Sequence, residues 1–264
     1  MLVFDKLVVD YRTDSAGQTT MRALDGLSLE LATGEAVSII GPSGCGKSTL
    51  LRLAAGLMQP SSGTVSLDGA ELKSPRSDTA LILQDYGLLP WKSVFANAEL
   101  GLKIAHVVAP ERKARTLEAL KKVGLAGFEK RYPAELSGGM QQRLALARAL
   151  AMDVNLLLMD EPLSALDALM REELQDTLLD LWKSSKHSQI LVTHSIEEAV
   201  FLGQRIVVMS PRPGRVLGIV DNPEMGARTY RSDDVFFERC KKVRSLLDAG
   251  VAQATEQEKG ATHE

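Results

Sequence analysis

The sequence predicts an α/β fold: a mostly parallel central sheet, an N-terminal antiparallel β subdomain and a helical subdomain inserted into the sheet. Three observations support this prediction. Short apolar runs without strict alternation, typical of strands covered on both faces, recur along the chain. Stretches with helical periodicity separate several of these runs. One long stretch, residues 90–150, contains helical patterns but no convincing strand.

The first 35 residues are predicted to form the antiparallel subdomain. Residues 2–11 and 23–35 have strand-like composition, and the polar segment 13–20 is expected to join them. Residues 65–69 are expected to add a further short strand.

The central sheet is predicted from five apolar runs, at residues 36–40, 79–83, 155–159, 189–193 and 205–209. Amphipathic helices are predicted at residues 47–57, 111–123 and 171–182. The helical subdomain is expected at about residues 86–152. Residues 221–264 are expected to form a C-terminal extension, with an amphipathic helix at 235–247 and a terminus that frays.

The composition is that of an ordinary globular protein, and it excludes several classes. The 264 residues are 45% hydrophobic, which is enough to bury a core, and the net charge of −3 predicts no nucleic-acid partner. No apolar run approaches the roughly 18 residues that span a bilayer, and no N-terminal stretch resembles a secretion signal. The two cysteines, Cys45 and Cys240, cannot form a disulfide framework and favour reduced thiols in the cytosol.

Polar residues follow four of the predicted strands at the point where each strand ends. The segment GPSGCGKST follows residues 36–40, and Gln84 follows residues 79–83. Two carboxylates and one imidazole follow the next two strands, at Asp160, Glu161 and His194. Since ligands of open α/β sheets bind beyond the carboxyl ends of the strands, these groups are predicted to share one site.

The segment GPSGCGKS matches the phosphate-loop pattern G-x-x-x-x-G-K-[ST], which predicts a phosphate-loop core. Its backbone N–H groups are expected to surround phosphate oxygens, and Lys47 is expected to reach the β- and γ-phosphates. Ser48 is expected to ligate Mg²⁺, and Thr49 to start a helix whose positive end faces the phosphates. The candidate nucleotide-binding residues here are Gly41, Pro42, Ser43, Gly44, Cys45, Gly46, Lys47, Ser48 and Thr49. A glycine-rich turn that binds nothing is the less favoured alternative.

The candidate catalytic residues are Glu161, His194 and Gln84. Buried carboxylates need a cationic partner, so Asp160 is expected to hold Mg²⁺ directly or through water. Glu161 is then placed to polarise the attacking water, a contribution of roughly 10²–10⁴-fold. His194 is expected to bond the γ-phosphate or orient that water. Gln84 is expected to sense the same phosphate or to reach Mg²⁺ through its amide oxygen. The other histidines, His106, His187 and His263, are expected to be ordinary surface or core residues.

The segment LSGGM at residues 136–140 precedes a run of helix formers, and LLLMDEP, SALD and His194 follow in that order. Together with the phosphate loop and Gln84, these motifs resemble the ATP-binding subunits of ABC transporters over residues 1–220. The resemblance implies a domain that binds ATP and Mg²⁺ and hydrolyses ATP. It implies that Ser137, Gly138 and Gly139 contact the γ-phosphate of ATP held by a second copy, which closes a head-to-tail dimer. It also implies that Tyr11 stacks on adenine.

Partners follow from the same resemblance. Residues 84–102 resemble the surface that receives a coupling helix from a transmembrane permease subunit, although Trp91 within it has the alternative of packing inside its own subdomain. Met140 and the segment MSPRPGRV at 209–216 resemble the importer branch for nitrate, sulfonates and taurine. Such a subunit would lie peripherally on the cytoplasmic face of the cell membrane and would depend indirectly on an extracytoplasmic solute-binding protein.

The main alternative is an ABC-type ATPase without a membrane partner, acting on DNA or ribosomes. DNA-repair relatives carry a long coiled coil between the phosphate loop and LSGG, where this chain has only about 90 residues. Ribosomal relatives usually carry two ATPase domains in one chain, and this chain has one. A non-enzymatic nucleotide-binding module would be expected to lack Glu161 or His194, and a small-molecule kinase has no role for LSGG.

Overall fold

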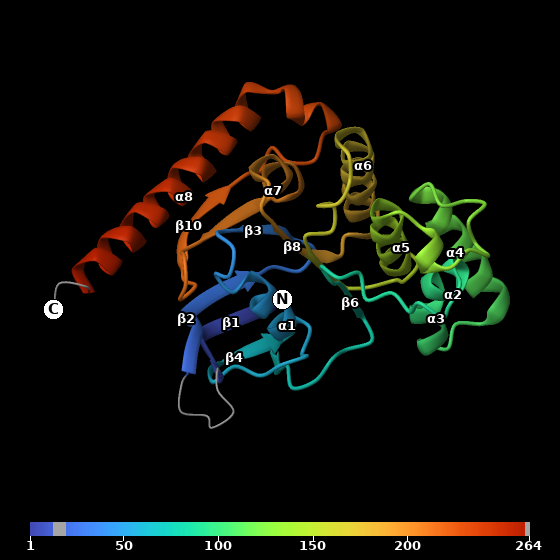
Figure 1. Ribbon diagram of the computed structural model, residues 1–264, viewed down its shortest axis with the longest axis horizontal. Coiled ribbons are helices and arrows are strands. Elements are labelled where there is room, and N and C mark those ends of the chain that lie inside the picture. Colours follow the sequence, from blue (N-terminus) through green and yellow to red (C-terminus); the bar gives the residue numbers. More distant parts are fainter. Residues whose placement is uncertain (13–19, 262–264) are drawn as a thin grey trace.

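The computed structural model describes residues 1–12 and 20–261. Most of the predicted 13–20 connection therefore lies outside the described residues. The chain forms two sheets (Figure 1): a four-stranded sheet of order β2-β1-β4-β5 and a six-stranded sheet of order β10-β9-β3-β8-β7-β6. The predicted α/β class, with one antiparallel and one mostly parallel sheet, is confirmed.

The four-stranded sheet contains β1 (Leu2–Arg12), β2 (Thr20–Leu31), β4 (Ser62–Leu67) and β5 (Ala70–Glu71), all paired antiparallel. The predicted strand at 65–69 ends earlier than expected, at Leu67. Asp68 and Gly69 have φ angles of 54° and 81°, which turn the chain into β5.

Five strands of the six-stranded sheet are parallel: β3 (Ala36–Ile40), β6 (Thr79–Ile82), β7 (Leu156–Asp160), β8 (Ser188–Thr193) and β9 (Arg205–Met209). Their bounds agree with the predicted runs to within one residue. The sixth strand, β10 (Val216–Asp221), was not predicted, and it pairs antiparallel with β9 at the sheet edge. The apolar run of β10 is interrupted by Gly218, and only Val220 of the strand is buried in the structure.

Helices cover both faces of the six-stranded sheet (Figure 1). On one face α1 (Lys47–Ala54) and the antiparallel sheet share an apolar core with the strands. On the other face the core includes α6 (Ala168–Ser185) and α7 (Ile196–Leu202). Helix α1 is shorter than the predicted 47–57 because Gly56, with a φ of 68°, turns the chain away.

The chain between β6 and β7 contains helices only, and it lies to one side of the sheets in Figure 1. These helices are α2 (Val94–Ala98), α3 (Leu100–Ile104), α4 (Ala109–Lys122), the 3₁₀ turn η1 (Pro133–Glu135) and α5 (Gly138–Leu150). Helix α5 contacts β6 as well as α2 and α4, so it connects this segment with the sheet. The domain boundaries at 86–152 and 221 stay predictions.

After β10 the chain forms the 3₁₀ turn η2 (Arg228–Ser232) and the long helix α8 (Asp234–Ala261), which includes the predicted helix at 235–247. The buried Tyr230 hydroxyl donates to Asn222, whose amide donates to the Val200 and Gly203 carbonyls at 2.7 Å each. The Arg231 guanidinium lies 3.4 Å from the centre of the Phe201 ring. These contacts hold the start of the extension on α7, and α8 then continues to Ala261.

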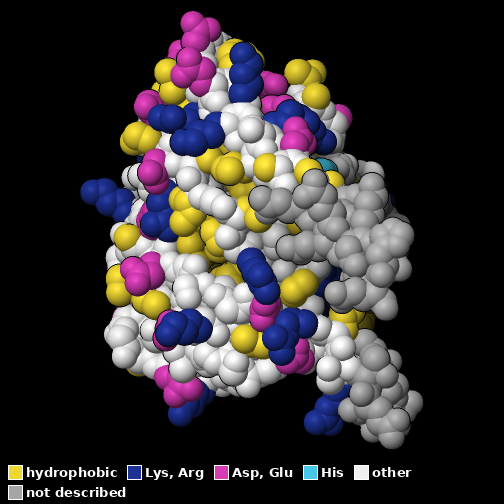
Figure 2. All heavy atoms as spheres, turned by 90° about the vertical axis from the view of Figure 1, so that its left-hand side faces the viewer, with side chains coloured by type: hydrophobic (Ala, Val, Ile, Leu, Met, Phe, Trp, Pro, Cys, Tyr) yellow, Lys and Arg dark blue, Asp and Glu magenta, His cyan; other side chains and the backbone are white. Residues whose placement is uncertain are grey.

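The surface carries charges of both signs. On the face seen in Figure 2, blue and magenta side chains are interspersed around a central group of yellow hydrophobic ones, outside the grey atoms. In the described residues, no helix combines the length and the apolarity required to cross a lipid bilayer.

Candidate nucleotide-binding and hydrolysis site

The predicted phosphate loop lies between the end of β3 and the start of α1. Gly46, the N-cap of α1, has a φ of 100°, and Gly44 has a φ of 75°. A Cβ atom on Gly46 would lie 2.6 Å from Leu24 Cδ2 and 3.0 Å from the Ala23 carbonyl oxygen. Both the backbone conformation and the close approach of β2 therefore require glycine at position 46.

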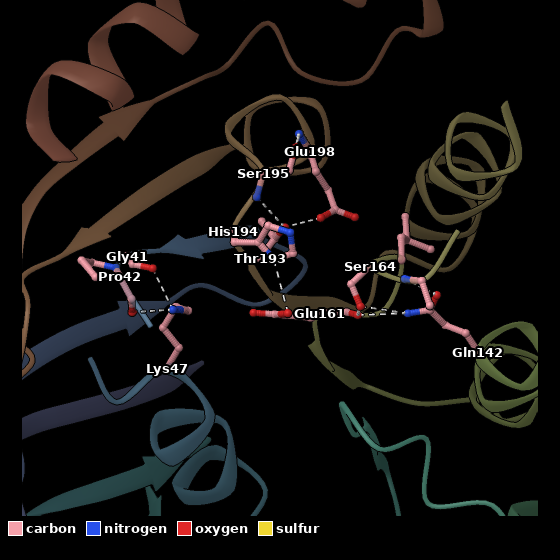
Figure 3. Close-up of polar contacts among 12 residues, drawn as sticks. Gly41, Pro42, Lys47, Gln142, Glu161, Ser164, Thr193, His194, Ser195 and Glu198 are labelled. Carbon is pink, nitrogen blue, oxygen red and sulfur yellow. Dashed lines mark hydrogen bonds and ion pairs between the residues drawn. The ribbon is translucent and has the colours of Figure 1, made fainter. Parts of the chain in front are cut away.

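Lys47 is largely buried and folds back over the loop (Figure 3). Its Nζ donates to the carbonyl oxygens of Gly41, at 2.8 Å, and Pro42, at 2.9 Å. It also lies 3.8 Å from Cys45 Sγ. Burial raises the pKa of the Cys45 thiol, so Cys45 acts as a neutral packing residue beneath the loop.

A cavity of about 330 Å³ opens over the loop. Its lining residues come from β1, β2, the start of α1 and four loops: Tyr11, Met21, Ala23, Ser43, Gly44, Gly46, Lys47, Ser48, Thr49, Gln84, Glu161 and Arg212. The Tyr11 hydroxyl lies 3.0 Å from Thr49 Oγ1 and donates to Met58 Sδ at 3.7 Å. The structure thus places the predicted adenine-stacking residue, the phosphate loop, Gln84 and Glu161 around one space.

Asp160 is the last residue of β7 and is 7% exposed. Burial raises the pKa of its carboxyl group, while a hydrogen bond with Ser48 acts in the opposite direction. The Ser48 hydroxyl is therefore close enough to the Asp160 carboxylate to affect its pKa, and Gln84 lines the same cavity as Ser48. Hydroxyl, carboxylate and amide oxygens suit Mg²⁺, so these residues fit the predicted ion.

Glu161 and His194 face each other across the ends of β7 and β8 (Figure 3). His194 Nδ1 lies 3.3 Å from Glu161 Oε2, with side chains 65% and 20% exposed, respectively. Glu161 has a φ of 50°, and its N–H donates to the Val192 carbonyl at 2.9 Å. A non-glycine residue in this conformation is held by its surroundings, which here direct a water-accessible carboxylate toward the cavity.

A buried amide that the sequence analysis missed supports Glu161 from behind. Gln142, in the second turn of α5, is 1% exposed, and its Nε2 donates to the Glu161 carbonyl at 3.1 Å. Its Oε1 accepts from the Ala165 N–H at 3.1 Å, and the Ser164 hydroxyl donates to the same Glu161 carbonyl at 3.1 Å (Figure 3). No local pattern distinguishes Gln142 from the neighbouring Gln141, because its partners are far away in the chain.

A second residue of the same helix holds the segment that follows Gln84. Arg148 donates to the Gly87 carbonyl at 2.7 Å and to the Tyr86 carbonyl at 2.8 Å. Burial lowers the pKa of Arg148, although a guanidinium stays charged in proteins. Helix α5 therefore connects LSGG with the segments after both Gln84 and Glu161.

His194 is fixed from the other side by a short polar chain. The Thr193 hydroxyl donates to the Glu198 carboxylate and accepts from the Ser195 N–H at 3.1 Å (Figure 3). Glu198 is buried, and this burial raises its pKa. The backbone on both sides of His194 is thereby anchored while its ring stays exposed.

The LSGG segment begins α5. Ser137 is the N-cap, and its Oγ accepts from the Met140 N–H at 3.3 Å. Ser137 and Gly138 are exposed, and neither they nor Gly139 are among the described residues that line the cavity over the phosphate loop. The first N–H groups of a helix have no intrahelical partner, so this segment offers donors that lie outside the cavity over the chain's own phosphate loop.

Trp91 is 71% exposed, so it does not pack inside its own subdomain. The alternative of a buried Trp91 is therefore wrong. An exposed aromatic side chain in this segment is compatible with a partner surface.

Comparisons with known proteins agree with these observations. The ABC transporter family profile matches residues 24–164. An ABC transporter ATP-binding protein of Methanocaldococcus jannaschii is 45% identical over 234 residues, which cover 89% of this chain and 87% of that protein.

Two further relatives have a named function. The taurine import ATP-binding protein TauB of Rhizobium johnstonii is 46% identical and covers 86% of this chain and 90% of its own length. TauB of Yersinia pestis is 48% identical, and the match covers 74% of this chain and 76% of that protein.

Among solved structures, the dimeric ABC transporter cassette MJ0796 is similar to this chain with a TM-score of 0.77 and 32% identity. The match covers 84% of this chain and 98% of that chain. A second structure of the same cassette, in a post-hydrolysis state with ADP and phosphate, matches equally well.

Proposed function

The chain belongs to the ATP-hydrolysing subunits of the ABC transporter family, and on that premise we propose that it powers import of taurine or a similar small solute. Relatives with 46% and 48% identity that are named taurine import proteins support this assignment. Nitrate, and sulfonates other than taurine, would be the alternative solutes for such an importer. The solute would cross through separate membrane permease subunits, since no described helix of this chain spans a bilayer.

The observation that carries the proposed mechanism is the separation of two anion-binding elements in one chain. The phosphate loop lines a cavity with Glu161, whereas Ser137 and Gly138 lie exposed at the start of α5. A second copy, placed head to tail, would bring its LSGG segment to the γ-phosphate of ATP bound in this cavity. The dimeric structure of the related cassette supports this arrangement.

Hydrolysis would use the residues at the strand ends. Lys47 and the loop N–H groups bind the phosphates, and Tyr11 stacks on adenine. Mg²⁺, held by Ser48, Gln84 and Asp160, would neutralise charge that develops on the phosphate oxygens. Glu161 accepts a proton from the attacking water, and His194, 3.3 Å from Glu161, orients that water against the γ-phosphate.

Loss of the γ-phosphate would break the bridge to the partner's LSGG segment, and the dimer would open. Helix α5 carries LSGG and is bonded to the segments after Gln84 and Glu161 through Arg148 and Gln142. The exposed Trp91 lies in the segment that Arg148 holds, so a permease docked there would respond to the nucleotide state. This docking would place the chain on the cytoplasmic face of the cell membrane, with the solute delivered by an extracytoplasmic binding protein.

Light scattering on the full chain with Mg²⁺ and ATP tests the dimer. In the Glu161→Gln background, which slows hydrolysis, we expect an ATP-dependent dimer. Adding Ser137→Arg should abolish it by filling the partner's phosphate site while leaving ATP binding intact. A normal dimer in the double variant would overturn the head-to-tail arrangement.

The role in import needs a separate measurement. With permease subunits in proteoliposomes, solute uptake should require ATP, and Trp91→Ala should reduce uptake while the ATPase rate of the isolated chain stays unchanged. Uptake that does not depend on this chain would favour the alternative of an ABC-type ATPase without a membrane partner.

A further inference from the structure

The segment between β9 and β10, which contains PRPGR, packs against the phosphate loop. The Gly214 N–H donates to the Ala23 carbonyl at 2.8 Å, and the Asp25 N–H donates to the Gly214 carbonyl at 3.2 Å. A Cβ atom on Gly214 would lie 2.0 Å from the Cys45 carbonyl oxygen. The segment is thus fixed between β2 and the phosphate loop by its own backbone.

This backbone position directs Arg212 into the nucleotide cavity. Arg212 Nε donates to the Gly44 carbonyl at 3.2 Å, and its Nη1 donates to Met21 Sδ. A Cβ atom on Gly44 would lie only 2.8 Å from Arg212 Nη2. Met21 pairs with Tyr11 across β1 and β2, so the guanidinium lies between the phosphate loop and the tyrosine.

Among the described residues, no carboxylate forms an ion pair with Arg212. Its neighbour Arg215 pairs with Asp25, and Arg22 pairs with Asp10 and Asp25. In the described part of the chain, none of the ion pairs includes Arg212, which is exposed. An unmatched guanidinium at the edge of a phosphate-binding cavity is suited to an anionic ligand.

We infer that Arg212 is a further nucleotide-binding residue, whose guanidinium contacts the α-phosphate of ATP or ADP. This inference rests on the proposed nucleotide site. In that site the β- and γ-phosphates lie at the loop and Lys47, and the base lies at Tyr11. The α-phosphate then lies between them, in the part of the cavity that Arg212 lines. A guanidinium forms charge-assisted hydrogen bonds with phosphate oxygens, which are stronger than neutral ones.

Calorimetric titration of the full chain with ADP and, in the Glu161→Gln background, with ATP tests this assignment. Arg212→Gln should weaken both nucleotides about tenfold, the size expected for one charge-assisted bond at a partly exposed site. Arg212→Lys should lose less, because it keeps the charge without the planar fork. Arg215→Gln serves as the matched control from the same segment and should leave ADP affinity unchanged, since Arg215 is paired with Asp25.

The salt dependence of nucleotide affinity distinguishes a phosphate contact by Arg212 from a purely structural role, in which Arg212 only holds Gly44 in place. The loss in Arg212→Gln should shrink between about 0.05 M and about 0.5 M salt, because screening weakens an exposed ionic contact. A loss that does not depend on salt, or an equal loss in Arg215→Gln, would show that the segment only shapes the loop and would overturn the inference. A loss confined to ATP would move the contact to the γ-phosphate and overturn the α-phosphate assignment.

The inference and the proposed function fail in different ways. Unchanged nucleotide affinity in Arg212→Gln, with normal binding by the parent chain, would overturn this inference alone. Absence of ADP binding by the parent chain would overturn the nucleotide site itself.

Discussion

The glycines of the phosphate loop and Gly138 of LSGG differ in backbone conformation and in the space available for a side chain. Gly44 and Gly46 have φ angles of 75° and 100°, and a Cβ atom on either would lie under 3.0 Å from a side chain of this chain. Gly138, at the start of α5, has nothing within 4 Å of where its Cβ would be. The chain's own fold requires the first pair of glycines and does not require Gly138.

This difference indicates which of the two proposed anion sites is complete within one chain. A non-glycine residue forced into the left-handed region costs about 1–3 kcal/mol, which explains Gly44 and Gly46 from the monomer alone. Glycine within a helix lowers the stability of that helix by up to about 1 kcal/mol relative to alanine. Gly138 therefore slightly destabilises α5, and no contact within the chain compensates for this. A ligand or partner that approaches the backbone closely would supply one.

The largest effect is expected from Glu161→Gln, which changes hydrolysis without changing either glycine segment. Glu161→Gln removes the base but keeps the cavity, so ATP turnover should fall by roughly 10²–10⁴-fold while ATP affinity is retained. Steady-state phosphate release and equilibrium binding measure the two quantities. Glu173→Gln, an exposed residue on α6, is the matched control and should have normal turnover. Unchanged ATP turnover in Glu161→Gln would contradict the assignment of Glu161 as the general base.

The next effect tests the internal constraint on the phosphate loop. Gly46→Ala should strain the loop by about 1–3 kcal/mol, because φ is 100° and Leu24 Cδ2 lies 2.6 Å from the added carbon. If the loop moves to relieve this strain, ATP affinity falls about tenfold for each 1.4 kcal/mol. Calorimetry and thermal unfolding report the two quantities, and normal values in both would contradict the structural requirement for glycine.

A smaller effect tests the connection between the two regions. Gln142→Leu removes the bond to the Glu161 carbonyl and leaves buried polar groups unpaired, at a cost of about 1–3 kcal/mol of unfolding free energy. ATP turnover should fall about tenfold through misplacement of Glu161, with ATP affinity nearly unchanged. The control is Gln141→Leu, whose amide bonds only the Pro133 and Leu136 carbonyls. Equal turnover losses in both variants would indicate general damage to α5 instead.

The smallest effect on the isolated chain concerns Gly138. Gly138→Ala should leave the monomer unchanged or stabilise it by up to about 1 kcal/mol, since the added methyl group meets no atom of the chain. The same methyl group would crowd a phosphate in a closed dimer, so the ATP-dependent dimer of the Glu161→Gln background should weaken. Denaturant unfolding and light scattering measure the two effects. A destabilised monomer with a normal dimer would reverse the comparison.

Much of the fold was predictable because its signals are local. Strands β3, β7, β8 and β9 are continuous apolar runs buried on both faces, and their bounds were found to within one residue. The edge strand β10 has mixed exposure and an apolar run that is interrupted by Gly218, and it was not predicted. Trp91 could be assigned neither to the core nor to the surface until its neighbours were known.

The sequence by itself determined which polar residues lie at the strand ends. Covalent order places Asp160 at the end of β7 and the phosphate loop, Gln84, Glu161 and His194 just after buried strands. Parallel pairing then brings these strand ends to one edge of the sheet. Only the tertiary structure decided what supports them. Gln142 lies 19 residues from Glu161, and Arg212 lies 168 residues from Gly44. Contacts over such separations depend on how the elements pack against one another, and no local pattern encodes them.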